Sequence, residues 1–168
     1  MASLLVVVTA ASLLPLFCTA APAGGGCDGA TCLSSSSSLE LDDLLSVSWV
    51  SDTKAGLATF TATLNSSAWV AIGFAKTPAA NMIGNSAIVY RPDANNSKSS
   101  VLEYDLKGMS VSQVTPVAKQ VITNTAGSDL NGTTSFSFTR PFAPGGGLNP
   151  INAKGNTTLI WAYGSDTT

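Results

Sequence analysis

The distribution of apolar and polar residues predicts β-strands along most of the chain. Leu45, Val47 and Trp49 are separated by single serines, and the apolar residues between positions 58 and 64 are separated by single threonines. Because the side chains of a strand point alternately to its two faces, this period of two predicts two strands with one buried face each. A turn at residues 52–56 lies between them, so we expect a hairpin with its aromatic residues on the inner face.

Several other segments have the composition of strands. Residues 69–74 form an unbroken apolar run, typical of a central strand, and Gly73 within it indicates a bulge or a close approach by another group. We expect further strands near residues 87–90, 101–104, 117–123, 133–139 and 157–163. No segment of useful length has helical periodicity. The predicted fold class is all-β, a single antiparallel β-sandwich of about eight or more strands.

The N-terminal region differs in composition from the rest. The first 23 residues carry no charged side chain, and their apolar run at residues 4–17 is shorter than the about 20 residues of a membrane-spanning helix. Small residues follow, so we predict a cleaved secretory signal peptide over residues 1–23, with an N-terminal anchor as the alternative. Glycine and serine dominate residues 24–38, which predicts a linker before a sandwich domain at 39–168.

The cysteines fit an oxidising compartment. Cys18 leaves with the predicted signal peptide, and Cys27 and Cys32 remain as an even pair in a glycine-rich segment. Outside the cell, such a pair is expected to form a disulfide. A zinc site is a poor alternative, because two thiolates without a histidine cannot complete a tetrahedral shell.

Composition limits the environment and the partners. Charged residues make up 11% of the 168 residues, against about 25% in typical soluble domains, and the net charge is −2 without a basic cluster. A nucleic-acid partner is therefore not expected. Four asparagines between predicted strands have the glycosylation pattern: Asn65, Asn95, Asn131 and Asn156. Together with the signal peptide, they predict a glycoprotein that is secreted or lies on the extracellular face of the plasma membrane.

The chain contains no histidine, which excludes most familiar catalytic sites. A Ser-His-Asp triad, a Cys-His dyad and a histidine-ligated zinc site cannot be assembled from it. The acidic residues have no recognisable pair spacing, and we interpret Glu40, Glu103, Asp105 and Asp129 as solvated surface acids. We therefore expect that this chain has no catalytic residue and is not an enzyme by itself.

Several short motifs follow one another in a particular order. Trp-Val-Ala-Ile-Gly-Phe at 69–74 precedes Asn-Met-Ile-Gly-Asn-Ser at 81–86 and Ala-Ile-Val-Tyr-Arg at 87–91. Glu-Tyr-Asp-Leu at 103–106, Phe-Ser-Phe-Thr-Arg-Pro-Phe at 136–142 and Leu-Ile-Trp-Ala-Tyr-Gly at 159–164 come later. From about residue 39 to residue 164, this order and spacing resemble the DOMON domain family.

The resemblance implies a b-type haem in a slot at one end of the sandwich. Met82 matches the methionine that is one axial ligand in haem-carrying members, and its sulfur is expected at the rim of a pocket between the sheets. The possible pocket walls are Ile72, Phe74, Ile83 and Tyr90. The family's second ligand is a histidine shortly after the last strand, which Thr168 precedes, so we expect a C-terminally truncated member. From its own context alone, Met82 is interpreted as filling a gap in an apolar core, which is the usual role of a methionine.

For function, the resemblance implies one-electron transfer. In relatives, the domain exchanges electrons with a flavin dehydrogenase or with a transmembrane b cytochrome, and membrane contact is expected here only through a missing C-terminal region. The alternative is a non-haem DOMON module that binds carbohydrate or mediates cell-surface contacts. In that case Trp69, Tyr90 and Tyr163 could offer stacking faces if they are exposed.

Overall fold

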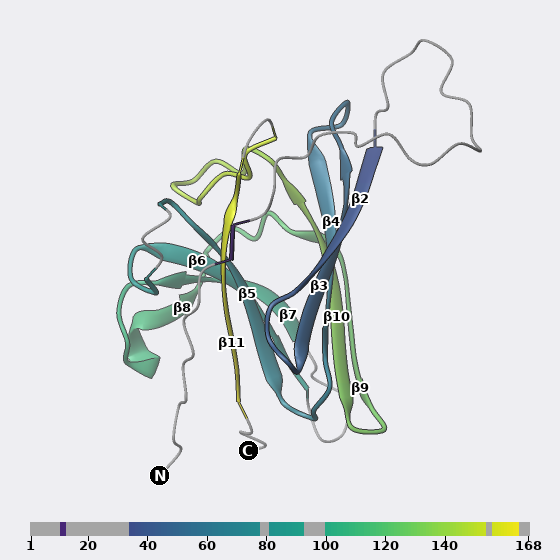
Figure 1. The fold of residues 1–168 in the computed structure, drawn as a ribbon. Coiled ribbons are helices and arrows are strands. Elements are labelled where there is room, and N and C mark those ends of the chain that lie inside the picture. Colours follow the sequence, from purple (N-terminus) through teal and green to yellow (C-terminus); the bar gives the residue numbers. More distant parts are fainter. Residues whose placement is uncertain (1–10, 13–33, 78–80, 93–99, 154–155, 165–168) are drawn as a thin grey trace, which may run out of the picture.

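The computed structural model describes residues 11–12, 34–77, 81–92, 100–153 and 156–164. These residues form two antiparallel sheets that pack face to face, as Figure 1 shows, and the described part of the chain contains no α-helix. The prediction of an all-β sandwich is therefore confirmed.

The two sheets have different strand orders. The six-stranded sheet runs β1 (Ala11–Ser12), β11 (Thr158–Gly164), β5 (Trp69–Ala75), β6 (Asn85–Arg91), β7 (Ser100–Leu106) and β8 (Val114–Pro116). The five-stranded sheet runs β2 (Ser34–Glu40), β3 (Leu45–Asp52), β4 (Leu57–Leu64), β10 (Thr133–Pro141) and β9 (Thr123–Leu130). A short 3-10 turn, η1 (Val111–Gln113), precedes β8.

The main core lies between the sheets and is rich in aromatic residues. The ring of Phe60 on β4 lies 5.3 Å from that of Phe74 on β5, so an edge-to-face contact joins the two sheets. Phe60 also stacks on Phe138 of β10 at 5.3 Å. Such aromatic pairs add about 0.5–1.5 kcal/mol beyond the burial of their area. The alternation in the sequence accounts for the inward position of these rings.

The predicted hairpin is present. Strands β3 and β4 pair in a register that sets Trp49 opposite Phe60, and both side chains are buried. The turn between the strands ends at Gly56, whose φ of +70° favours glycine. The expected close approach at Gly73 is also present, because the side chain of Ile160 on β11 occupies the space where a Cβ atom of Gly73 would lie.

Two predictions of local structure are wrong. Ser34 to Ser38 lie in strand β2 and not in a linker, because the backbone of an edge strand pairs with β3 whatever its side-chain propensity. The strand expected at 117–123 starts only at Thr123 and continues to Leu130. This edge strand is almost wholly exposed, so it has no alternation to reveal it. The Asn131-Gly132 turn, with both φ values positive, was the available signal for its hairpin with β10.

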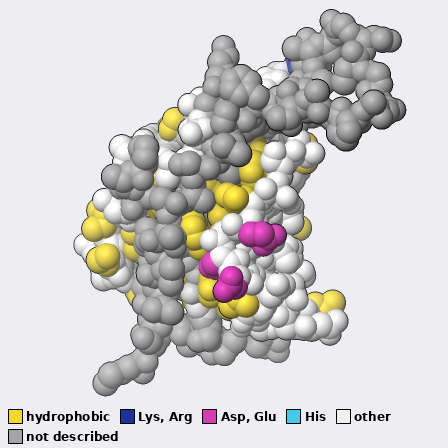
Figure 2. All heavy atoms as spheres, in the orientation of Figure 1, with side chains coloured by type: hydrophobic (Ala, Val, Ile, Leu, Met, Phe, Trp, Pro, Cys, Tyr) yellow, Lys and Arg dark blue, Asp and Glu magenta, His cyan; other side chains and the backbone are white. Residues whose placement is uncertain are grey.

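Parts of the N-terminal predictions lie outside the described residues. Cys27 and Cys32 are among them, so the disulfide stays a prediction. The predicted glycosylation site Asn95 also lies outside the described residues. Of the predicted signal peptide, only β1 is described, and it pairs with Leu159 and Thr158 at the edge of the six-stranded sheet. Within the described part of the chain, no helix is long and apolar enough to cross a membrane. Figure 2 shows few charged side chains on the visible described surface, in keeping with the low charge content.

Candidate functional site

The outer face of the six-stranded sheet, which points away from the five-stranded sheet, is apolar. A second hydrophobic cluster lies there, separate from the main core, and we name it the outer cluster. Its buried members are Ala71, Ala87, Val89, Leu106 and Ile160, and Trp69, Ala75, Met82, Tyr104 and Val114 pack against them half-buried. An antiparallel sheet that turns one face to water normally places polar residues on that face. This face is therefore built to be covered.

The centre of the outer cluster is made of small residues. On β5 this face presents Ala71, Gly73 and Ala75, and on β6 it presents Ala87. A Cβ atom on Gly73 would lie 2.7 Å from Cγ1 of Ile160 and 2.8 Å from a backbone oxygen, so no side chain fits there. The centre of the outer cluster is thus made of methyl groups, with the side chain of Ile160 over Gly73.

Met82 reaches the outer cluster from the loop that joins β5 to β6. Asn85 holds this loop, since its Nδ2 donates to the carbonyl of Asn81 at 2.6 Å and its Oδ1 accepts the N–H of Lys76 at 3.1 Å. Gly84, with a φ of +81°, donates its N–H to the carbonyl of Leu106 at 2.8 Å. The thioether of Met82 is therefore presented to an apolar surface by a loop that is bonded at several points.

The residues expected to form a pocket with Met82 do not come together with it. Ile72, Phe74 and Tyr90 are buried in the main core between the sheets, while Ile83 is 52% exposed. The reason is the strand period of two, which turns these three side chains inward and the residues beside them outward. The predicted wall is wrong for this arrangement, because Met82 packs on the opposite side of the same sheet.

A buried ion pair was missed at the sequence level. Arg140 of β10 and Glu103 of β7 are both 0% exposed, and Oε1 of Glu103 accepts from Nη2 of Arg140 at 2.9 Å and from Nε at 3.2 Å. Ser86 donates to the same oxygen at 3.0 Å, and the guanidinium lies 4.5 Å from the centre of the Phe74 ring. Glu103 is therefore not a surface acid. Burial lowers the pKa of Arg140, although Glu103 beside it acts in the opposite direction.

The ion pair is connected to the Met82 loop by Asn149. Nη1 of Arg140 donates to the carbonyl of Asn149 at 2.8 Å. The side-chain Nδ2 of Asn149 donates to the carbonyl of Phe74 at 2.5 Å and to Oδ1 of Asn85 at 2.7 Å. A continuous series of hydrogen bonds therefore runs from the core to the loop between β5 and β6.

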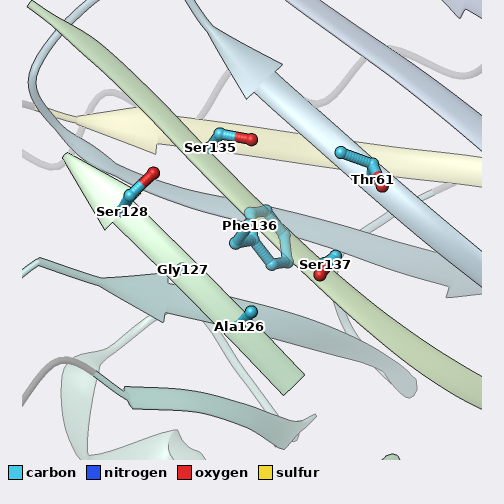
Figure 3. A pocket seen from close by; sticks show the side chains of 7 residues that line it. All are labelled: Thr61, Ala126, Gly127, Ser128, Ser135, Phe136 and Ser137. Carbon is cyan, nitrogen blue, oxygen red and sulfur yellow. The ribbon is translucent and has the colours of Figure 1, made fainter. Parts of the chain in front are cut away.

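The outer face of the five-stranded sheet carries a different feature, an open polar depression of about 230 Å³ (Figure 3). It is lined by Thr61, Ala126, Gly127, Ser128, Ser135, Phe136 and Ser137. Gly127 cannot carry a side chain because the ring of Tyr90 occupies the position of its Cβ atom from within. Four hydroxyl groups and the small residues of β9 thus define a shallow hydrophilic site.

The remaining predicted site residues differ in their exposure. Tyr90 is buried and has no exposed stacking face, while Trp69 and Tyr163 are half-buried. Asn65, Asn131 and Asn156 are exposed, as glycan acceptors need to be, and glycosylation itself stays a prediction. Among the described residues, no group of three or more acidic, cysteine or histidine side chains could hold a metal ion.

Comparison with known proteins agrees with the resemblance in the motifs. The family model described as DOMON domain matches residues 41–164, which is most of the chain. Searches of curated proteins and of solved structures find no match. The chain therefore belongs to the DOMON domain family.

Proposed function

We propose that this DOMON domain binds a b-type haem against the outer cluster, with Met82 as one axial ligand, and passes single electrons outside the cell. One observation carries the proposal: Met82 is half-buried on an apolar sheet face where a solvated sheet would be polar. Met109, by contrast, is 70% exposed and matches no feature of the family.

The residues of the outer cluster fit a flat macrocycle. Cofactor sites are mostly apolar with few polar anchors, and the outer cluster has this composition, with alanines at its centre. A bound haem would supply a reversible one-electron couple. The thioether of Met82 would raise its reduction potential, because a soft ligand favours ferrous iron. The 168 residues contain no histidine, so they supply no imidazole as a second ligand of the iron.

The proposed electron partners are a flavin dehydrogenase or a transmembrane b cytochrome. The position of the outer cluster on an outer face of the sandwich supports a carrier role, since electron transfer needs a short distance between cofactors and no enclosed substrate site. The predicted signal peptide and the exposed asparagines of the sequons support an extracellular location.

The test is a titration of the purified chain with hemin, with and without imidazole, which replaces the missing nitrogen ligand. With imidazole we expect a six-coordinate low-spin spectrum and the weak charge-transfer band of methionine-ligated ferric haem. Met82→Ala should lose that band and bind hemin about tenfold more weakly, a change of about 1.4 kcal/mol. Met109→Ala is the matched control and should behave as the unmodified chain. Absence of binding with imidazole, or equal spectra for Met82→Ala, would refute the haem site.

A second candidate function is the binding of a small polar ligand such as a carbohydrate. The observation that favours it is the depression on the five-stranded sheet, where hydroxyls of Thr61, Ser135 and Ser137 surround an open volume of about 230 Å³. Ser135→Ala combined with Ser137→Ala should abolish sugar binding in calorimetry, whereas Ser48→Ala on the same sheet should not. Sugar binding that survives the double substitution would place the ligand elsewhere.

A further inference from the structure

We infer that Asn85 and Asn149 are positioning residues that fix Met82 over the outer cluster by coupling its loop to the buried Glu103–Arg140 pair. The role of these asparagines in haem binding rests on the proposed function, whereas their role in positioning Met82 rests on the hydrogen bonds alone. Neither asparagine contacts the cofactor in this proposal. Each acts through the loop.

The first step is the closure of the loop by Asn85. One oxygen and one nitrogen of this buried amide contact both limbs of the loop, at the N–H of Lys76 and at the carbonyl of Asn81. Met82 follows Asn81 directly, so the bond of 2.6 Å fixes the backbone one residue before the thioether. A buried amide that loses such a partner incurs a desolvation penalty, so the closed loop is favoured.

The second step is the alignment of Asn85 by Asn149. Asn149 is 1% exposed, and its single Nδ2 group bonds both the carbonyl of Phe74, near the end of β5, and Oδ1 of Asn85, at the start of β6. The side chain of Asn149 therefore connects the end of β5 to the start of β6, on either side of the loop that carries Met82. With Oδ1 engaged in this way, the amide of Asn85 is oriented with its Nδ2 toward Asn81.

The third step is the anchoring of Asn149 itself. It follows a segment in which Gly145, Gly146 and Gly147 all have positive φ, and this segment belongs to no strand. Such a backbone has little intrinsic preference for one position. Two bonds hold it beside Asn149: Nη1 of Arg140 donates to the carbonyl of Asn149 at 2.8 Å, and the N–H of Ile151 donates to the carbonyl of Phe142 at 2.8 Å. Arg140 is in turn held by Glu103, so a buried ion pair is one of the contacts that position Asn149.

The fourth step is the consequence for the site. Apart from Trp69 and Tyr104, the outer cluster consists of side chains without a polar group, so its packing gives the Met82 thioether little directional constraint. The loop therefore contributes most to the position of Met82. It is held after Met82 by the bond from Gly84 to Leu106 and before Met82 by the series Glu103, Arg140, Asn149, Asn85 and Asn81. Groups that orient a metal ligand typically change metal affinity by about 10–100-fold when they are removed.

The experiment uses the whole chain with carbon-13 in its methionine methyl groups. Asn149→Ala should shift and broaden the Met82 methyl resonance in the haem-free protein, while the exposed Met109 serves as an internal reference and stays unchanged. Hemin affinity in the presence of imidazole should fall about tenfold. Asn156→Ala, an exposed asparagine in the same connection between β10 and β11, is the matched control and should change neither signal.

A second variant covers the case in which Asn149→Ala fails to fold. Asn85→Asp keeps the acceptor for Lys76 and Asn149 but loses the donor to Asn81, so the Met82 resonance should move with the fold intact. An unmoved Met82 resonance in this variant would overturn the inference. If the unmodified chain binds no hemin while the variants still shift Met82, the proposed function fails and the positioning role stands.

Discussion

The two outer faces of the sandwich are built from opposite kinds of residue. The five-stranded sheet exposes a field of hydroxyl groups to solvent, in register across β3, β4 and β10. This field consists of Ser46, Ser48, Thr59, Thr61, Thr63, Ser135 and Ser137. The six-stranded sheet instead presents the outer cluster. Because both sheets share one chain and one core, the composition of the protein does not explain the difference. The apolar face is the exception, and an exception of this kind marks a surface with a partner.

The contrast also separates two ways of placing a small residue. On the six-stranded sheet, Gly73 leaves space for the side chain of Ile160, which comes from the neighbouring strand β11. On the five-stranded sheet, Gly127 leaves space for an aromatic ring that comes from inside. The first contact packs the outer cluster within one sheet, and the second joins the two sheets through the main core. Glycine in a strand is therefore informative only together with the direction from which its neighbour approaches.

The strongest test of the comparison places a carboxylate on each face. Ala87→Asp puts a charge at a position that is only 4% exposed, next to Val89 and Leu106 in the outer cluster, and we expect a loss of about 3 kcal/mol or more in the free energy of unfolding. Ser48→Asp, on the hydroxyl field, should change it by about 0.5 kcal/mol or less. Urea denaturation measures both. Equal losses would mean that the two faces are equally solvated.

A smaller effect is expected at the centre of the apolar face. Gly73→Ala should cost about 1–3 kcal/mol, because the new methyl group meets Ile160 and the backbone oxygen of Ser86. Combining it with Ile160→Ala should remove the side-chain clash but leave the contact with the oxygen. Thermal unfolding of both variants measures the loss of stability that each contact causes. A Gly73→Ala protein as stable as the unmodified chain would show that β5 can move away from β11.

The sequence predicts one half of this comparison better than the other. Alternation identifies β3, β4 and β10 and assigns their aromatic residues to the core, since one face of each strand is polar. In β5 and β6 both faces are apolar, so periodicity reveals a buried strand without saying which residues point to which sheet. For this reason the sequence alone places Ile72, Phe74 and Tyr90 beside Met82, and the structure does not.

The buried hydrogen bonds of Glu103, Arg140 and Asn149 could not be predicted from the sequence, for a different reason. Glu103 and Arg140 are 37 positions apart and lie on different sheets, so nothing local distinguishes their burial from ordinary surface charge. Asn149 lies in a proline- and glycine-rich segment that predicts only a loop. Its role depends on which strand ends it reaches, and that is a property of the assembled sandwich.

The two methionines of the described residues give a further, more moderate test. Met82→Ala should lower the free energy of unfolding by about 1 kcal/mol, because a half-buried side chain leaves the outer cluster. Met109→Ala should change it by less than about 0.5 kcal/mol, since Met109 is 70% exposed. Chemical denaturation of the haem-free proteins compares them. If the two substitutions had the same effect, Met82 would not be packed in the outer cluster.

The smallest effect on stability is expected at the contact between the turn that joins β2 to β3 and strand β11 of the six-stranded sheet. Asp42, in the turn between β2 and β3, accepts the indole N–H of Trp161 on β11 at 3.2 Å. The pKa of the nearby Tyr163 phenol is raised, first by burial and then by the charge and hydrogen bond of Asp42, with Asp43 contributing least. The neutral phenol is thus favoured in the folded state. Its contribution to stability is complete below the ordinary tyrosine pKa of about 10 and is lost as the pH rises through the higher folded value.

This raised pKa can be separated into its causes by alkaline titration. Asp42→Asn removes the charge but keeps an acceptor for the turn, so the pKa of Tyr163 should fall toward its ordinary value without reaching it, because burial remains. Asp43→Asn is the matched control and should lower the pKa by less. Carbon-13 resonances of the tyrosine rings follow the titration, with three tyrosines in the chain to resolve. If Asp43→Asn lowered the pKa more than Asp42→Asn, the contact between the turn and β11 would not be the electrostatic link between the sheets.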